Sequence, residues 1–467
     1  GGGAAGLFLG WNTLGGLITM LPPDPGTSAL NATLDLRILA FTATVAILSG
    51  VLCGMFPALR TSRTTLQSVF KDQGANATGG VGSVRLRKSL IVTQVAMTAV
   101  LLVAAGLFGE SLIRTQRENL GMRIDHIVQF DFSPGLSRYS PPQTVDLFNR
   151  LREKLVALPG VSSVTAGDQA LLAGGMEVDT VNFEGCPDKD INPWVNRVEP
   201  NFFSTLGIPL QRGRVFRETD SLSSPAVAII SESAAQKYFA GRDPIGFRLG
   251  FGGEAPHIEI IGVVGDVRQN DPRWSPEPSI YFPLRDVAKS ATFYIRTALS
   301  PSAIIPTLRN TAAKTAPDVA ATHFRTLTDQ LSNIIFDERL LTFLTLAFGF
   351  LAALLACVGL YGVMAYVVAR RTREIGIRVA LGANKSDVFR LVVGQGIVPV
   401  IVGTAAGIAF ALGLSRYLQS LLYRVRPTDA PIFVAVALLL FGVSLAACYV
   451  PACRATRVDP MVALRYE

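Results

Sequence analysis

The sequence predicts an α-helical membrane protein with an α+β domain outside the membrane. Of its 467 residues, 49% are hydrophobic and only 17% are charged, whereas a soluble globular protein usually carries about 25% charged residues. Five long apolar segments carry no charged side chain, and one polar region separates the second from the third. The uncharged segments lie between Arg37 and Arg60, Lys88 and Glu110, Arg339 and Arg370, Arg390 and Arg416, and Asp429 and Arg454.

Each of these segments reaches the length of a membrane-spanning helix. About 20 apolar residues cross the hydrocarbon core, where a helix satisfies every backbone polar group. Gly1 to Pro23 is a sixth apolar stretch, and it lacks a starting methionine, a basic region and a cleavage site. It therefore does not fit a signal peptide, and we expect a fragment that starts inside a membrane segment.

Basic residues in the short connections predict the orientation of the spans. Lysine and arginine favour the cytoplasmic side, and they are concentrated in residues 60–88 and 370–390. The polar region then faces outward and residues 454–467 face inward, with three arginines in the loop 416–426 as an exception. The net charge of +8 lies beside the membrane, because the polar region holds 23 basic and 26 acidic residues, so no nucleic-acid partner is predicted.

The polar region predicts two subdomains, the second inserted into the first. A helical pattern from Thr144 to Leu158 ends at Pro159-Gly160, and the strand-like VSSVTA follows it. Between about Gly174 and Pro283, short runs such as VAII, IEIIGVVGDV and SIYFPL indicate a strand-rich insert. A second helix is expected from Pro301 to Ala316. This order of helices and strands is typical of an α+β domain.

An internal repeat indicates two membrane modules. Pro57–Arg63 matches Pro451–Arg457, and Asp35 matches Asp429 at the same offset. Each copy consists of a span, a short outer loop, a second span and a basic tail. We therefore expect the end of one module and the whole of another, joined by the flexible glycine-rich linker Gly74–Gly82.

The sequence predicts no catalytic, cofactor or metal site. A phosphate-binding loop needs G-x-x-x-x-G-K-[ST], and Gly382–Ser386 has the wrong glycine spacing for it. His126, His257 and His323 are far apart and have no paired cysteines, which a metal site would require. The spans carry no charged residue, so an ion-driven or proton-driven carrier is not expected.

Two further features of the polar region have simple interpretations. Asp266 and Asp271, near Arg268, could form an acidic pair with a cation, but in GVVGDVRQNDP we favour a solvated turn after a strand. Cys186 is the one cysteine of the polar region, so no disulfide framework can form within it.

The most informative stretch is residues 370–383, RRTREIGIRVALGA. On a helix, Arg371, Glu374 and Arg378 share one face, and Glu374 precedes Arg378 by the four residues that suit an ion pair. Ile375 lies on another face, which makes the helix amphipathic. Such a helix can dock in a groove of a partner protein or rest on lipid headgroups, and the residues leave both open.

Several motifs resemble MacB-type permeases of the FtsX superfamily, and they cover nearly the entire chain. They are RKSLIVTQVAMTAVLLVAAGLF, FFSTLGIPLQRGRVF, SESAAQKYFAGRDPIG, IIGVVGDVR, RRTREIGIRVALGA and RATRVDPMVALRYE. The resemblance implies a four-helix FtsX-like transmembrane module and a porter-like α+β subdomain with a strand-rich insert, in the bacterial inner membrane. The repeat further resembles duplicated permeases without a fused ATPase.

The resemblance also implies a division of the chain into parts. They are the end of a first FtsX-like module (1–60), a cytoplasmic linker (61–88), a transmembrane helix (89–110), a periplasmic MacB-like core domain (111–337, insert about 174–283), and an FtsX-like permease domain with three spans (338–467) that includes a coupling helix (370–383). The long apolar segment from Leu340 to Ala369 would form a stalk helix.

The implied function is that of a permease subunit in an ABC-type efflux or mechanotransmission system. A dimeric ABC ATPase on a separate subunit would hydrolyse ATP, and this chain would bind no cofactor itself. The expected contacts to the ATPase are Arg371, Glu374, Ile375, Arg378 and Leu381. The other partners expected are membrane lipid and a periplasmic or outer-membrane component.

Two other functions stay open. An FtsX-like signalling protein would use the same fold to activate a periplasmic enzyme such as a cell-wall hydrolase. A membrane anchor whose outer domain simply binds a ligand would not depend on an ATPase at all.

Overall fold

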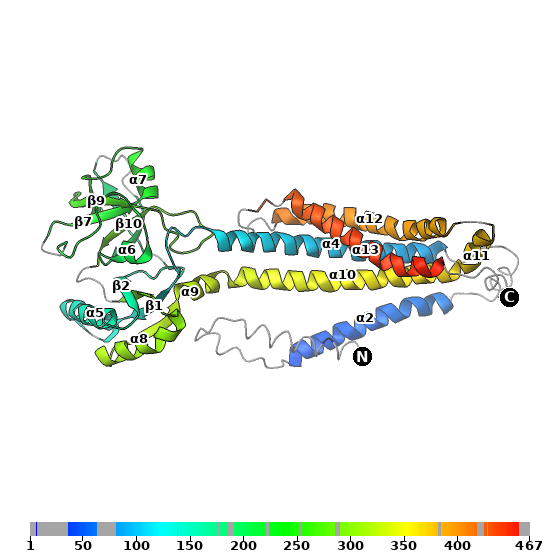
Figure 1. Ribbon diagram of the computed structural model, residues 1–467, viewed down its shortest axis with the longest axis horizontal. Helices are drawn as coiled ribbons and strands as arrows, with labels where there is room; N and C mark the ends of the chain where they lie inside the picture. Colours follow the sequence, from blue (N-terminus) through cyan, green and yellow to red (C-terminus); the bar gives the residue numbers. More distant parts are fainter. Residues whose placement is uncertain are drawn as a thin grey trace. The chain divides into compact units, whose positions relative to one another are not determined.

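The computed structural model describes Gly6 and residues 36–62, 81–417 and 425–456, apart from residues 138, 176, 185–190, 221–223, 253, 285–289, 382–383 and 427. The chain divides into two compact units, shown in Figure 1. The membrane unit comprises Gly1–Gly109 and Leu340–Glu467, and the sheet unit comprises Glu110–Arg339. Except for Gly6, the predicted span Gly1–Pro23 lies outside the described residues, as does the predicted linker up to Gly80.

The described helices of the membrane unit include four of the predicted spans. They are α2 (Leu36–Ser62), α4 (Val81–Arg117), α10 (Phe336–Arg370), α11 (Thr372–Ala380), α12 (Lys385–Tyr417) and α13 (Ala430–Ala455). Among the described residues, four stretches, one each in α4, α10, α12 and α13, are long and apolar enough to cross a membrane. The remaining described helix at a predicted span is α2. Its apolar stretch, Ala40–Val51, is shorter than the stretches in the other four helices. The 35 residues of α10 extend about 52 Å, more than the hydrocarbon core requires.

Small residues bring α12 against α4. A Cβ atom added at Gly403 would lie 2.8 Å from the carbonyl oxygen of Val92, and one added at Gly407 would lie 2.5 Å from that of Ala96. Both distances are shorter than a side chain permits, so the two backbones are in direct contact. Glycines four residues apart on a helix allow this approach in membrane proteins.

One half of the sheet unit, here called the βαβ half, consists of four antiparallel strands and two main helices. The strand order is β12 (Ala321–Thr326), β1 (Ile127–Phe132), β11 (Ala291–Thr297) and β2 (Val161–Gly167), and the helices are α5 (Pro141–Val156) and α8 (Pro301–Thr315). Phe130 stacks on its strand neighbour Phe293 at 5.4 Å between ring centroids. The connectivity is that of a split βαβ fold, and both predicted helices and the strand after α5 are present.

The α5 helix has a local cause in the sequence. The Ser140 backbone N–H donates to Gln143 Oε1 at 3.0 Å, which forms part of a capping box. Proline at the start of the helix needs no N–H partner there. Leu147 and Leu151, one turn apart, are fully buried against the sheet.

The other half, here called the insert half, continues the sheet. Its strands are β3 (Glu177–Val178), β4 (Val181–Phe183), β5 (Trp194–Val198), β6 (Leu210–Gly213), β7 (Val227–Ser231), β8 (Arg248–Phe251), β9 (Ile258–Val264) and β10 (Ser279–Pro283). The predicted strands in VAII, IEIIGVVGDV and SIYFPL are β7, β9 and β10. Two short helices, α6 (Phe202–Leu206) and α7 (Glu232–Phe239), interrupt the strands, and the sequence reading did not include them.

The two halves share one continuous sheet. The strand path runs from β12, β1, β11 and β2 into β5, β10, β7, β9, β8 and β4. At the junction, the described residues of β2 and β5 pair at Gly167 and Val198. The sheet is therefore continuous but narrow where the halves meet.

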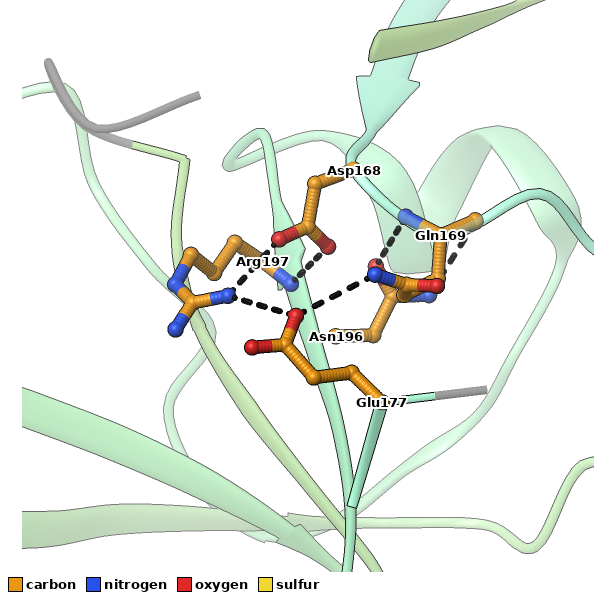
Figure 2. A network of polar contacts seen from close by, with 5 residues as sticks. All are labelled: Asp168, Gln169, Glu177, Asn196 and Arg197. Carbon is orange, nitrogen blue, oxygen red and sulfur yellow. Dashed lines mark hydrogen bonds and ion pairs between the residues drawn. The ribbon is translucent and has the colours of Figure 1, made fainter. Parts of the chain in front are cut away.

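Side chains reinforce this junction (Figure 2). Asp168 accepts hydrogen bonds from the backbone N–H of Arg197 at 2.7 Å and from its guanidinium at 2.9 Å. Glu177 Oε2 accepts from the same guanidinium at 3.1 Å and from Gln169 at 3.2 Å. The backbone N–H of Gln169 donates to Asn196 Oδ1 at 3.3 Å, so β5 and the loop after β2 are bonded through both backbone and side chains.

The prediction of a solvated turn after β9 is wrong. Arg268, Gln269 and Asn270 are only 8%, 6% and 6% exposed. Asp266 and Asp271 do not form an acidic pair around Arg268, because Asp266 accepts from the Ser233 backbone and Asp271 binds Arg273. Burial of these polar groups is tolerated because most of them have partners from other parts of the sheet unit.

Candidate coupling site

Helix α11, at the place of the predicted coupling helix, follows α10 almost without a break. The Thr372 hydroxyl donates to two carbonyl oxygens in the last turn of α10, that of Val368 at 3.0 Å and that of Ala369 at 2.9 Å. The backbone N–H of Ile375 donates to the Arg371 carbonyl oxygen at 2.9 Å. The orientation of α11 is therefore set by the end of α10.

One face of α11 carries three linked charges. The Glu374 carboxylate binds Arg378 at 2.8 Å and lies 3.8 Å from Arg371. All three side chains are about half exposed, so the pairs contribute little to stability, roughly 0.3–0.5 kcal/mol each. They place one acid between two bases on the exposed surface. The predicted ion pair between Glu374 and Arg378 is confirmed.

Ile375 holds the helix to the membrane unit. Its side chain is 2% exposed and belongs to the same apolar core as Val368, Val388 and Val392. Burying a side chain of this size stabilises by about 1.5–3 kcal/mol, more than the exposed ion pairs supply. The inward face of α11 is thus an anchor, and its outward face is free to carry the charges.

A small pocket lies beside the charged face. Its lining includes the predicted residues Arg371, Glu374, Ile375 and Arg378, together with five others: Val367 and Val368 from α10, and Leu391, Val392 and Gln395 from α12. Leu381 is not part of the lining and is 83% exposed. The structure therefore brings four of the five predicted residues together and leaves Leu381 on open surface.

The residues that α12 contributes to the pocket were not predicted from the sequence. Gln395 gave a weak signal, because a polar amide inside an otherwise apolar span needs a protein partner or a polar cavity. Leu391 and Val392 gave none, since apolar residues in a span face either lipid or protein with equal ease. The site holds charges, amide and apolar surface, which suits binding to a protein chain.

The described residues contain no group of three or more histidine, cysteine, aspartate or glutamate side chains able to hold a metal ion. His323 lies on the surface, where its Nδ1 contacts the Asp131 carboxylate at 2.9 Å.

One buried carboxyl group of the sheet unit has a perturbed titration. Glu199 follows β5, is 7% exposed, and has no hydrogen-bond partner for Oε2 among the described residues. Burial raises the pKa of Glu199 to about 7, although the positive charge of Arg152 lowers it. The backbone N–H of Glu199 donates to the Ala166 carbonyl oxygen at 3.0 Å, which holds the backbone of this residue at the junction of the two halves.

We expect Glu199→Gln to stabilise the sheet unit at about pH 8 but not at about pH 5. The folded carboxyl group keeps its proton up to a pKa of about 7, whereas the unfolded one loses it near 4.5. Stability therefore falls as the pH rises through this interval, by up to about 3 kcal/mol. Hydrogen exchange of the sheet unit at both pH values measures the effect, with the exposed Glu254→Gln as control. An equal gain at both pH values would contradict the assignment.

Fold and site together define a class of protein. Several apolar helices can cross a membrane, a large sheet unit lies between α4 and α10, and a short charged helix lies between α10 and α12. This is a multi-pass permease with one large domain outside the lipid.

Family comparisons identify the class more closely. Residues 90–326 match the model of the MacB-like periplasmic core domain, and residues 346–460 match that of the FtsX-like permease C-terminal domain. The chain belongs to the MacB/FtsX family of ABC transporter permeases. It is a multi-pass inner-membrane protein, and its sheet unit is periplasmic.

Curated relatives share a moderate part of the sequence. The pyoverdine export ATP-binding/permease protein PvdT of Pseudomonas syringae pv. tomato is 29% identical over 296 residues, which cover 60% of this chain and 43% of that protein. The macrolide export ATP-binding/permease protein MacB of Rhodospirillum rubrum is 27% identical over 349 residues, or 72% and 51% of the two chains. The chain spans about half the length of the curated relatives it matches.

Two solved structures align with part of the chain. The periplasmic region of MacB from Actinobacillus actinomycetemcomitans is 18% identical with a TM-score of 0.32, and the match covers 44% of this chain and 92% of that one. The extracellular domain of the noncanonic ABC-type transporter YknZ from Gram-positive bacteria is 18% identical with a TM-score of 0.30, and the match covers 42% and 100%.

Proposed function

We propose that this chain is the permease subunit of an ABC-type efflux system, in which a separate ATPase drives movement of the periplasmic sheet unit. The observation that carries the proposal is α11, a helix anchored by Ile375 that presents Arg371, Glu374 and Arg378 to an outside partner. ATP hydrolysis would change the position of α11, and α10 would carry that change along its length because a continuous helix is stiff. Efflux is supported by two relatives, a pyoverdine export protein and a macrolide export protein.

The charge pattern favours a protein partner for α11 over lipid alone. An anionic membrane surface attracts lysine and arginine but repels an acid, and Glu374 lies in the middle of the exposed face. The adjoining pocket is small and mainly apolar, so the exposed charged side chains, and not the pocket, would supply most of the contact with a partner. Arg371 and Arg378 would then bind acidic groups of the ATPase, and Glu374 a basic one.

The internal repeat supports a separate ATPase. Pro57–Arg63 repeats Pro451–Arg457, which lie at the end of α13 and directly after it. The residues before the periplasmic domain therefore resemble the end of another permease module. A dimeric ATPase would engage both modules, each through its own coupling helix.

The experiment is a charge reversal on the coupling helix. We expect Glu374→Arg to abolish co-purification of the ABC ATPase and to remove ATP-dependent function, because three adjacent cations replace an alternating pattern. Ile375 still anchors α11, so the thermal stability of the chain should stay close to the wild-type value. Pull-down from membranes and ATP hydrolysis by the purified complex give the two readouts.

Glu153→Arg is the matched control, since it reverses an exposed glutamate on α5 in the periplasmic unit. It should leave both readouts unchanged. Normal ATPase binding by Glu374→Arg would overturn the proposed contact. Full function without any ATPase would favour a ligand-binding anchor instead, and loss of a periplasmic enzyme's activity without loss of export would favour a signalling protein.

A further inference from the structure

Residues Asp266–Trp274, here called the hub segment, connect β9 to the loop before β10, and the centre of the segment is buried in the sheet unit. Arg268, Gln269 and Asn270 at its centre are buried, which is unusual for three consecutive polar side chains. Such burial is stable only where specific partners replace water. The hub segment has partners in five other parts of the sheet unit, although Asn270 Oδ1 has none among the described residues.

Arg268 binds the chain directly after α4. Its Nη2 donates to the Glu118 carboxylate at 2.7 Å, and its Nε donates to the Asn119 carbonyl oxygen at 3.2 Å. Its backbone N–H donates to the Leu120 carbonyl oxygen at 3.0 Å. Three hydrogen bonds to three consecutive residues fix this segment against the hub, and two of them come from a buried guanidinium.

Arg273 binds the first turn of α10. Its guanidinium forms ion pairs with Glu338 and with Asp271 of the hub segment itself. Glu338 is nearly buried, so this pair is screened little by water or salt. Within five residues, the hub segment thus binds both chain segments that continue into membrane-spanning helices.

The opposite side of the hub segment binds the insert half. Gln269 Nε2 donates to Ser279 Oγ at 3.0 Å and to Tyr281 Oη at 2.9 Å, both on the central strand β10. Asp266 Oδ1 accepts from the backbone N–H of Ser233, in the first turn of α7, at 2.8 Å. A displacement of the hub segment would therefore reach β10 and α7 directly.

The contacts between the halves limit how such a displacement can spread. Strand pairing between them is confined to Gly167 and Val198, beside the network of Figure 2. The halves also share an apolar core, to which β11 and α6 both contribute, so the insert half would turn about this core and not separate from it. Gln330 of α9 (Leu327–Ile334), just before α10, donates to the Leu172 carbonyl oxygen, and the Leu172 N–H donates to Gln269. The start of α10 thus reaches the hub by a second route.

We propose that the hub segment transmits movement of α4 and α10 to the insert half, with Arg268 and Arg273 as its positioning residues. This inference rests on the proposed function, because it assumes that ATP moves the membrane helices. It assigns to two arginines and two acids, Glu118 and Glu338, a role in coupling that is separate from ATPase binding at α11.

The test measures movement within the sheet unit of the full-length protein. Spin labels are attached through Asp146→Cys on α5 and Gln236→Cys on α7, both exposed, with the native cysteines replaced by serine. The protein is reconstituted with its ATPase in lipid nanodiscs, and pulsed electron resonance gives the label distance with and without ATP. The hub variants are Arg273→Gln, Glu338→Gln and Arg268→Gln; Arg212→Gln, an exposed arginine of β6, is the matched control.

We expect wild type and Arg212→Gln to show an ATP-dependent change of distance. Arg273→Gln and Glu338→Gln should lose it while the complex still hydrolyses ATP, and Arg273→Lys, which keeps the charge, should recover part of it. If Arg268→Gln fails to fold, the partly exposed Arg273 still provides the test.

Two outcomes separate the claims. An unchanged distance response in Arg273→Gln and Glu338→Gln would overturn the role of the hub segment and leave the proposed function standing. No response in the wild type, despite ATP hydrolysis by the bound ATPase, would also overturn the role of the hub segment but not the proposed function, because a rigid movement of the whole sheet unit leaves this distance unchanged. The proposed function fails if no ATPase binds the chain.

Discussion

Replacing Gly407 with leucine is expected to destabilise the membrane unit by about 3 kcal/mol or more, because the new side chain would meet the backbone of α4. A single Cβ atom at this position already lies 2.5 Å from the Ala96 carbonyl oxygen and 2.6 Å from the Ala99 Cβ. Backbone cannot give way as a flexible side chain can, so α12 must move away from α4. The midpoint of thermal unfolding in detergent, followed by circular dichroism, measures the loss.

Gly413→Leu provides the control on the same helix, since nothing lies within 4 Å of a Cβ atom added there. It should unfold close to the wild-type temperature. Equal effects of the two substitutions would mean that helix propensity or lipid contact, and not packing against α4, decides the stability. Gly407→Ala should give an intermediate loss, because it adds only the first clashing atom.

Gly121→Val is expected to destabilise the sheet unit by about 3 kcal/mol or more, because it combines backbone strain with a steric clash. Gly121 has φ +73°, a conformation that a β-branched residue rarely adopts, and an added Cβ would lie 1.8 Å from the Asp266 carbonyl oxygen. The substitution also pushes the hub segment away from the residues after α4. Hydrogen exchange of the sheet unit in the full chain measures the loss of protection.

Gly241→Val separates the two contributions. Gly241 also has positive φ, +86°, but nothing lies within 4 Å of an added Cβ atom, so only the backbone strain of about 1–2 kcal/mol remains. A clearly larger effect at Gly121 supports the close contact with Asp266. Similar losses of stability at both positions would show that the hub segment can move away from residue 121 without destabilising the sheet unit.

The coupling helix could be predicted largely from local sequence. Glu374 and Arg378 are four residues apart, and on a helix this spacing alone brings them within reach of each other. The pocket beside them could not be predicted, because Leu391 and Gln395 come from α12 and their orientation depends on how two helices pack. The inward position of Ile375 follows from the amphipathic pattern, but its partners do not.

The hub segment is where sequence reasoning failed. GVVGDVRQNDP is polar, contains Gly and Pro signals, and follows a strand, so a solvated turn was the natural interpretation. Arg268 is buried because Glu118 lies beside it, although 150 residues separate them in sequence. Arg273 and Glu338 are 65 residues apart. No local sequence pattern distinguishes an arginine that is buried in an ion pair with a distant residue from one that is exposed to water.

Sequence by itself determined the membrane spans, the orientation predicted from basic connections, the α+β character of the polar region and the charged face of α11. These properties depend on composition and on spacing within a few residues. Both can be counted in the sequence, because lipid insertion depends on apolar length and the faces of a helix depend on its periodicity. Tertiary structure alone decided that Gly403 and Gly407 meet α4, that the two halves share one narrow sheet, and that the hub segment binds the ends of two membrane helices. Each of these is a contact between distant residues, and its free energy appears only once the chain has brought both partners together.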